Sequence, residues 1–151
     1  MWARIGQQVT IPTPGQEERA YGIGAVNYHT GATVMITRDH KCKADVAVML
    51  QQLLDRHPTG TIYLAWDNSP THFGGEIEVV LKKAQGRLVL LYLPTYSPWL
   101  NPIEMLWRRM RYDVTHCELF TALAELKAAF LNYFALTSKE TVRSIIGSKA
   151  A

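Results

Sequence analysis

The stretch TIYLAWDNSPTH, residues 61–72, decides the fold class of this chain. It opens with an apolar run rich in β-forming residues, which lies between Gly60 and the turn-forming residues 67–70. A short, continuous apolar run between turn residues is typical of a strand buried on both faces. We therefore predict a buried strand at 61–66 that ends directly before Asp67.

Helices and strands alternate on either side of this strand. Apolar residues recur at spacings of three and four in 43–57 and again in 74–84, which predicts two helices. A second continuous apolar run predicts a strand at 87–93. The other predicted elements are strands at 21–26 and 32–36, joined by a turn of hairpin length, and helices at 103–114 and 121–136. This order predicts an α/β fold, with a mixed sheet flanked by helices.

Composition sets limits on function. With 151 residues, the chain is long enough for one domain, and 48% hydrophobic residues exclude a disordered segment. A net charge of +3 permits nucleic-acid binding without demanding it. No apolar stretch has the length of a membrane span or a secretory signal, so we expect a cytoplasmic protein with no membrane partner. Cys42 and Cys117 form no metal-binding pair.

Glycines and prolines in residues 1–16 predict an irregular lead-in, with a short strand at 8–11.

Asp67 is the first candidate site residue. A strand end is a rigid support, and α/β folds place their sites at the carboxyl ends of strands. The alternative is structural: Asp67 and Asn68 start turns well, because their side chains bond to nearby backbone amides. This segment alone favours the structural alternative.

The second candidate segment is LPTYSPWLNPIEMLW, residues 93–107. Asn101 is a good N-cap and Pro102 a good first helical residue, which places Glu104 at the third helical position. The functional hypothesis is that Glu104 projects from the helix start towards Asp67. The structural alternative is a capping box, in which Glu104 reaches back to the amide of Asn101.

The two segments together are more informative than either alone. One helix separates the predicted strands 61–66 and 87–93, so these strands are expected to lie close in the sheet and to bring Asp67 and Glu104 together. Two close carboxylates repel each other, and a divalent cation removes that conflict. Mg²⁺ prefers oxygen ligands, and two such ions can clamp the attacking and leaving oxygens of a phosphodiester.

At these residues the sequence resembles a known family. The string Leu-Pro-x-Tyr-Ser-Pro-x-Leu-Asn-Pro-Ile-Glu-x-x-Trp, at 93–107, resembles the signature of DDE-type transposases, in particular the mariner-related bacterial insertion-sequence group. Asp67-Asn68 with His72 resembles the second motif of the same family. The resemblance extends over nearly the whole chain, since the Trp-Ala-Arg lead-in at 2–4 and the strand at 21–26 also fit.

The resemblance implies an RNase H-like fold and a catalytic core for metal-dependent cleavage and strand transfer of DNA at transposon ends. Asp67 and Glu104 would be the second and third catalytic carboxylates, and would bind Mg²⁺ or Mn²⁺, two ions in the complete enzyme. The implied partners are the terminal inverted repeats and target DNA, with a homodimer as the complete assembly. The residues that would shape the motif are Asn68, Pro94, Tyr96, Ser97, Pro98, Asn101, Pro102 and Trp107.

One departure from the family pattern leaves an alternative open. The family carries its first catalytic Asp on a first strand upstream of the Trp-Ala-Arg-like segment, and this sequence opens at that segment. We therefore expect residues 1–151 to form one partial endonuclease domain, truncated at its N-terminus, without the first strand and without a DNA-binding helix-turn-helix domain. The alternative function is a catalytically inactive remnant, or a DNA-binding or dimerising module that keeps the fold.

Four basic residues are further candidates for DNA contact. His72 follows Asp67 closely, and Arg108, Arg109 and Arg111 follow Glu104 on the predicted helix. Arginines in such positions can bind phosphates. A turn-stabilising role for His72 and a solvated helix face for the arginines are the structural alternatives.

Overall fold

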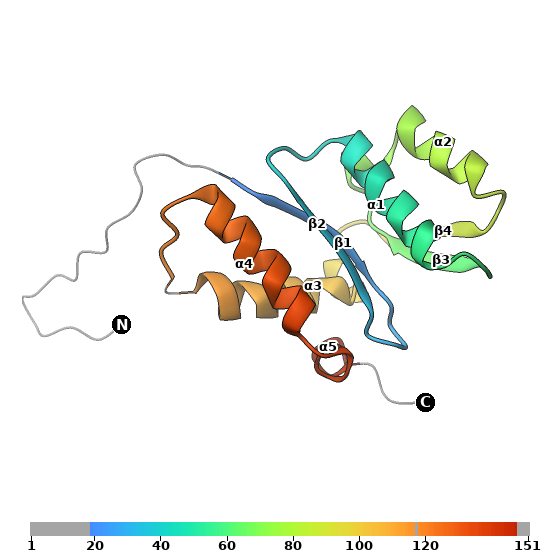
Figure 1. Ribbon diagram of the computed structural model, residues 1–151. Coiled ribbons are helices and arrows are strands. Elements are labelled where there is room, and N and C mark those ends of the chain that lie inside the picture. The colour runs from blue at the N-terminus through green and yellow to red at the C-terminus, as the bar shows by residue number, and fades with distance from the viewer. Residues whose placement is uncertain (1–18, 117, 148–151) are drawn as a thin grey trace, which may run out of the picture.

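A computed structural model describes residues 19–116 and 118–147 (Figure 1). The predicted lead-in at 1–16, the short strand at 8–11 and Cys117 lie outside these ranges. The helices and strands, in chain order, are β1 (Tyr21–Val26), β2 (Thr33–Arg38), α1 (Lys43–Arg56), β3 (Ile62–Trp66), α2 (Gly75–Lys83), β4 (Leu88–Tyr92), α3 (Ile103–Met110), α4 (Leu123–Leu136) and α5 (Lys139–Ile145).

The strands form two pairs. β1 and β2 make an antiparallel hairpin in which Tyr21 lies opposite Arg38. Asn27 organises its turn, because its side-chain oxygen accepts hydrogen bonds from the amides of His29 and Thr30. β3 and β4 are parallel, with α2 as the crossover. Among the described residues the two pairs are separate sheets, since no ladder joins one to the other.

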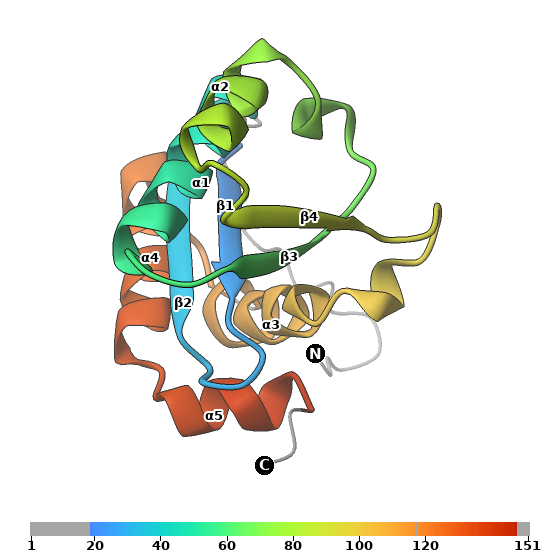
Figure 2. The same ribbon diagram turned by 90° about the vertical axis from the view of Figure 1, so that its right-hand side faces the viewer.

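Helix α1 packs against both sheets and forms a first hydrophobic core with them. Val46 and Leu50 on its inner face are fully buried. They share this core with apolar residues from β1, β2, β3 and α2. Burying one such side chain contributes about 1.5–3 kcal/mol. Figures 1 and 2 show α1 and α2 on the same side of the strands.

A second core covers the opposite face of the hairpin. Leu106 from α3, Phe130 from α4 and Val142 from α5 meet there, and Val26 and Met35 of the hairpin pack against them. The hairpin is therefore covered on both faces. The β3–β4 pair is different: Tyr63 on its other face is 68% exposed.

The clearest departures from the sequence prediction are the end of one helix and the presence of one additional helix. The helix predicted at 103–114 ends at Met110, and a π-helical turn continues to Thr115. Helix α5 was not predicted, although Ser138 supplies an N-cap by accepting a hydrogen bond from the Thr141 amide. No helix within the described ranges is long and apolar enough to cross a bilayer.

Candidate active site

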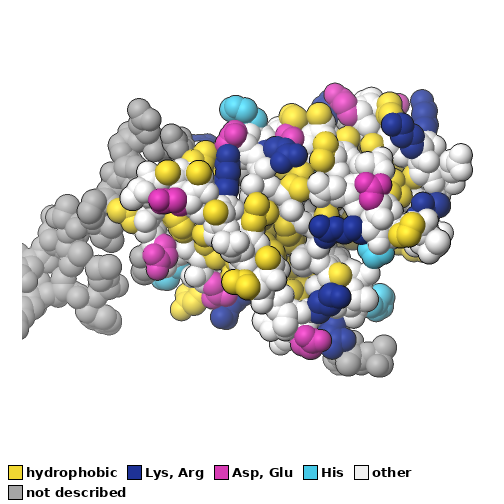
Figure 3. All heavy atoms as spheres, viewed as in Figure 1, with side chains coloured by type: hydrophobic (Ala, Val, Ile, Leu, Met, Phe, Trp, Pro, Cys, Tyr) yellow, Lys and Arg dark blue, Asp and Glu magenta, His cyan; other side chains and the backbone are white. Residues whose placement is uncertain are grey.

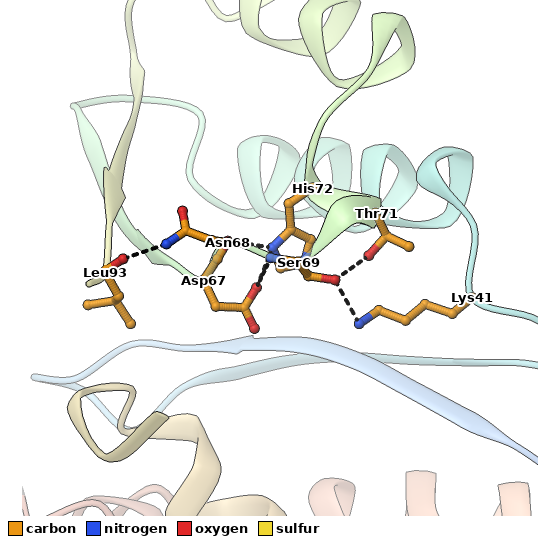
Figure 4. Close-up of polar contacts among 7 residues, drawn as sticks. All are labelled: Lys41, Asp67, Asn68, Ser69, Thr71, His72 and Leu93. Carbon is orange, nitrogen blue, oxygen red and sulfur yellow. Dashed lines mark hydrogen bonds and ion pairs between the residues drawn. The ribbon is translucent and has the colours of Figure 1, made fainter. Parts of the chain in front are cut away.

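Asp67 leaves the end of β3 and its carboxylate makes two local contacts. Oδ1 accepts a hydrogen bond from the Ser69 amide at 3.2 Å and lies 2.6 Å from Nδ1 of His72 (Figure 4). The first contact is the turn-starting bond of the structural alternative, which is therefore present. It does not bury the group, because the side chain is 51% exposed and remains accessible to a ligand.

Two neighbours hold this loop in place. Asn68 donates from Nδ2 to the backbone oxygen of Leu93 at 2.8 Å, which ties the end of β3 to the residue after β4. The imidazole of His72 packs on the Trp66 ring, with centroids 4.1 Å apart. These contacts fix the direction in which Asp67 leaves the sheet.

The segment between β4 and α3 presents Glu104. Tyr96 has a φ of +58° and is 90% exposed, and Pro98 starts a short 3₁₀ turn. The amide of Asn101 donates to the Pro98 oxygen at 3.0 Å. Within the described chain, no bond from Glu104 reaches that amide, so the capping box is not formed and the carboxylate is left for another role.

Asn101 nevertheless holds the start of α3. Its backbone oxygen accepts from the Glu104 amide at 3.0 Å, and its side-chain oxygen accepts from the Ile103 amide at 3.4 Å. Pro102 has helical dihedral angles, with φ −57° and ψ −28°. Both observations agree with the helix start predicted from the sequence.

Asp67 and Glu104 line the same cavity, which has a volume of about 720 Å³ and lies between β1 and β3. The parallel pairing of β3 and β4 explains this meeting, because both loops that carry the carboxylates leave the same edge of the sheet. The other predicted site residues at this cavity are His72, Asn101, Pro102 and Trp107.

The sequence matches a known protein family over most of its length. The family model of the DDE superfamily endonucleases matches residues 1–127. The chain belongs to the DDE superfamily of endonucleases. A curated relative from Shigella sonnei, the "Insertion element IS630 uncharacterized 39 kDa protein", is 30% identical over 149 residues, which are 98% of this chain and 42% of the relative.

Solved structures with the same fold include those of Mos1 transposase. The paired-end complex with the left transposon end superposes with a TM-score of 0.70 at 16% identity, over 97% of this chain and 46% of that one. The Mos1 mariner paired-end complex with Mn gives 0.68 at 17% identity, with the same coverage. The predicted α/β, RNase H-like fold is thereby confirmed. The chain spans less than half the length of these relatives.

The three candidate arginines that follow Glu104 are separate from this cavity. None of Arg108, Arg109 and Arg111 lines the cavity. Arg109 binds the Asp113 carboxylate at 2.8 Å, and this bond raises the pKa of the guanidinium. Arg111 donates to the Trp107 oxygen at 3.3 Å.

The phenol of Tyr133 joins this ionic cluster and donates to Asp113 at 3.0 Å. Burial, and then the neighbouring carboxylate, raise the pKa of Tyr133. Arg109 and Tyr133 thus connect the end of α3 to α4, which gives Arg109 a structural role in this superfamily member.

Lys41 was missed by the sequence analysis. It precedes α1, lines the cavity and donates from Nζ to Ser69 Oγ at 3.4 Å (Figure 4). The only signal was a basic residue between a predicted strand and a predicted helix, which is common in surface loops. Its position places a positive charge beside Ser69, on the cavity that Asp67 and Glu104 also line.

The donor set fits a divalent cation in part. Asp67 and Glu104 offer the carboxylate oxygens that Mg²⁺ and Mn²⁺ prefer. Among the described residues, however, no group of three or more His, Cys, Asp or Glu side chains could hold a metal ion. The candidate site thus presents two possible ligands, which line one cavity.

Proposed function

We propose that this chain is the catalytic core of a transposase, which cleaves DNA at transposon ends and joins those ends to target DNA. The observation that carries the proposal is the convergence of Asp67 and Glu104 on one cavity at the end of the parallel strands. Membership of the DDE superfamily supports it, as does the presence of transposon-end DNA in the named Mos1 complex.

In this proposal Asp67 and Glu104 hold Mg²⁺ or Mn²⁺, two ions in the complete enzyme. A bound ion supplies Lewis-acid stabilisation to the phosphodiester oxygens. His72 orients Asp67 through the 2.6 Å contact. Lys41 adds a positive charge that favours a phosphate in the cavity.

The proposed partners are the terminal inverted repeats and target DNA, bound by a homodimer in a bacterial cytoplasm. Figure 3 shows Lys and Arg side chains interspersed with Asp and Glu over one face, so charge on this face is not gathered into one basic patch. Arg108, which is exposed, and His72 are the proposed phosphate contacts. Arg109 and Arg111 would contribute only if their present bonds rearrange.

The test is direct metal binding by the full chain, followed as loss of the free Mn²⁺ signal in electron paramagnetic resonance. We expect Asp67→Asn and Glu104→Gln each to weaken Mn²⁺ binding by about tenfold or more, because loss of even an outer-shell partner of a metal site costs about 10–100-fold. Asp55→Asn and Glu78→Gln, on exposed positions of α1 and α2, are the matched controls. Equal binding by all four variants and the parent would refute the assignment of the site.

A second function is favoured by one observation: residues 19–116 and 118–147 contain only two candidate ligands at this cavity. A chain that keeps the fold could bind DNA or dimerise without cleaving it. This function requires salt-sensitive DNA binding with no nicking in Mg²⁺ or Mn²⁺. Metal-dependent nicking that Asp67→Asn abolishes would exclude it.

A further inference from the structure

Exposed aromatic side chains gather on the two loops that leave the carboxyl edge of the β3–β4 pair. Phe73 lies in the loop after β3, and Tyr92 ends β4. Their rings stack with centroids 5.8 Å apart and an interplanar angle of 7°, yet both remain roughly half exposed. Tyr96 and Trp99 follow in the segment between β4 and α3, and Trp99 is 75% exposed. We call these four side chains the edge aromatics.

The edge aromatics are next to the candidate site along the chain. Phe73 directly follows His72, and Trp99 is separated from Asn101 by Leu100 alone. Both His72 and Asn101 line the cavity described above. Figure 2 shows the segment after β4 extending beyond the strands before it turns back to α3. The rings are therefore close to the place where the proposed function puts a phosphodiester.

The backbone at Tyr96 leaves its ring outside the fold. Its φ of +58° lies in the left-handed region, which is strained for a residue with a Cβ. Such strain persists where the surroundings fix it, and it is common at ligand clamps. The turn has hydrogen bonds of its own, since the Leu100 amide donates to the Ser97 oxygen at 3.1 Å. Burial of the tyrosine ring is thus not what holds this segment.

The chemistry of this segment selects a nucleobase over a phosphate. Residues 93–103 contain no Asp, Glu, Lys, Arg or His, so the segment offers no charge to a phosphate. Exposed tyrosine and tryptophan rings offer flat faces on which bases stack. Exposed apolar side chains that gather on one surface mark an interaction site. The ligand of this surface is therefore expected to be flat, aromatic and close to a phosphodiester.

An unpaired base meets this description better than a paired one. Inside a duplex each base is already stacked on both faces, whereas a splayed base can stack on an aromatic side chain. We propose that the edge aromatics bind unpaired bases of single-stranded DNA beside the phosphodiester in the cavity, with Tyr96 and Trp99 as the main stacking surfaces. This inference rests on the proposed function and adds a substrate class to it: DNA whose strands are separated next to the reacting phosphate.

The first experiment measures binding of a fluorescein-labelled oligothymidylate of about eight nucleotides to the full chain by fluorescence anisotropy. EDTA is present, so that no metal ion contributes. An abasic oligomer of the same length and charge is the matched probe. We expect the oligothymidylate to bind about tenfold or more tightly than the abasic oligomer, because its bases can stack. Equal binding of the two probes, or no binding of the oligothymidylate, would overturn the proposal.

Substitution of the rings locates the base contacts. Tyr96→Ala and Trp99→Ala should each weaken the oligothymidylate by about fivefold or more and leave the abasic oligomer unchanged. Trp99→Phe keeps a ring and should retain most of the affinity. Tyr112→Ala, which changes a 64% exposed tyrosine outside these loops, is the control. Unchanged oligothymidylate affinity in Trp99→Ala, or an equal loss in Tyr112→Ala, contradicts the proposal.

Tyr96→Gly separates binding from folding. It removes the ring and also relieves the strain of the positive φ, because glycine adopts this conformation freely. We expect it to weaken the oligothymidylate as much as Tyr96→Ala does, and to melt at the temperature of the parent or above. A lower melting temperature would show that the ring serves the fold, and would overturn its assignment as a base contact.

The requirement for unpaired bases is tested with a fully paired duplex. Trp99→Ala should not weaken binding of this duplex, and a loss as large as that for the oligothymidylate would overturn the requirement.

Failure of this proposal and failure of the proposed function give different results. If Asp67→Asn and Glu104→Gln leave Mn²⁺ binding unchanged while Trp99→Ala still weakens the oligothymidylate, the metal site is wrong and the base-binding surface stands. If the carboxylate variants weaken Mn²⁺ binding and Trp99→Ala changes nothing, the metal site stands and the base-binding surface is refuted.

Discussion

The β1–β2 hairpin and the β3–β4 pair are built from strands of similar length but have different surroundings. Helix α1 covers one face of the hairpin, and the core formed by α3, α4 and α5 covers the other. The β3–β4 pair has α1 and α2 on one face only, and Tyr63, Leu91 and Tyr92 remain exposed.

Because of this difference, the hairpin contributes mainly to stability, whereas the β3–β4 pair carries the candidate site. Fully covered strands contribute burial on both faces, and the carboxylate that follows the hairpin, that of Asp39, is paired with Lys127 of α4. The half-covered pair has the carboxylates, because its parallel strands end at one edge and leave their loops open to a ligand. We therefore expect substitutions around the hairpin to lower the free energy of unfolding. Substitutions on the open face of β3 should leave it almost unchanged.

The largest expected effect comes from Phe130→Ala. Phe130 is 7% exposed, stacks on Trp107 with centroids 5.8 Å apart, and lies against Gly22 of the hairpin. Removing a buried phenylalanine costs about 3–5 kcal/mol of unfolding free energy. Urea denaturation followed by circular dichroism measures the change.

Two controls sharpen this prediction. Leu131→Ala, at the next position and 41% exposed, and Tyr63→Ala, on the open face of β3, should each change the unfolding free energy by about 0.5 kcal/mol or less. A loss for Tyr63→Ala as large as that for Phe130→Ala would show that the two regions do not differ as described.

A smaller effect is expected from Gly31→Ala in the hairpin turn. Gly31 has a φ of +73°, and an added Cβ would lie 2.2 Å from the Lys139 oxygen of α5. Backbone strain of about 1–2 kcal/mol and overpacking of about 1–3 kcal/mol should combine to a loss of about 2–5 kcal/mol. Thermal and urea unfolding report the sum.

Gly60→Ala is the matched substitution next to β3. Its φ of +80° is similar, but an added Cβ meets nothing within 4 Å. Only the strain should remain, about 1–2 kcal/mol. Equal losses in the two variants would mean that the contact between the turn and α5 contributes nothing.

The smallest effect concerns the ion pair between Asp39, just after β2, and Lys127 of α4. The hydrogen bond and the charge of Lys127 hold the pKa of Asp39 below its ordinary value in the folded chain. The stabilisation is thus present above about pH 4 and is lost as the pH falls through the lowered pKa. Because both groups are at the surface, it is also screened by salt.

Asp39→Asn should therefore lower the melting temperature slightly at about pH 7 and by less at about pH 2. Lys127→Met should remove the same pH-dependent stabilisation, because it removes the other partner of the ion pair. A deficit in Asp39→Asn that persists unchanged at the acidic pH would assign the effect to packing instead of charge.

Much of this fold could be predicted because its signals are local. The apolar run before Asp67 predicted the bounds of β3 to within one residue at each end. The helical spacing in 43–57 predicted those of α1 equally well. The cap and proline before Glu104 gave the start of α3. Parallel pairing of two apolar runs around one helix then brought both carboxylates to one cavity.

Other features depend on tertiary contacts and could not be predicted locally. The partner of Arg109 is Asp113, one helical turn away, but the choice also needs Tyr133 from α4. Lys41 reaches the site only because β2 and α1 place it beside Ser69. Helix α5 has a local signal at Ser138, yet it is short and depends on the second core for stability.

The two connections described above also set an order of assembly. The hairpin closes through a turn at residues 27–32, whereas β3 and β4 meet only after the chain has crossed over through α2. Loop closure over a longer segment costs more entropy, so non-local parallel pairing forms more slowly than a hairpin. We expect pulsed hydrogen exchange during refolding to protect β1 and β2 before β3 and β4. The carboxylates of Asp67 and Glu104 would then meet late, when the rest of the chain is already in place.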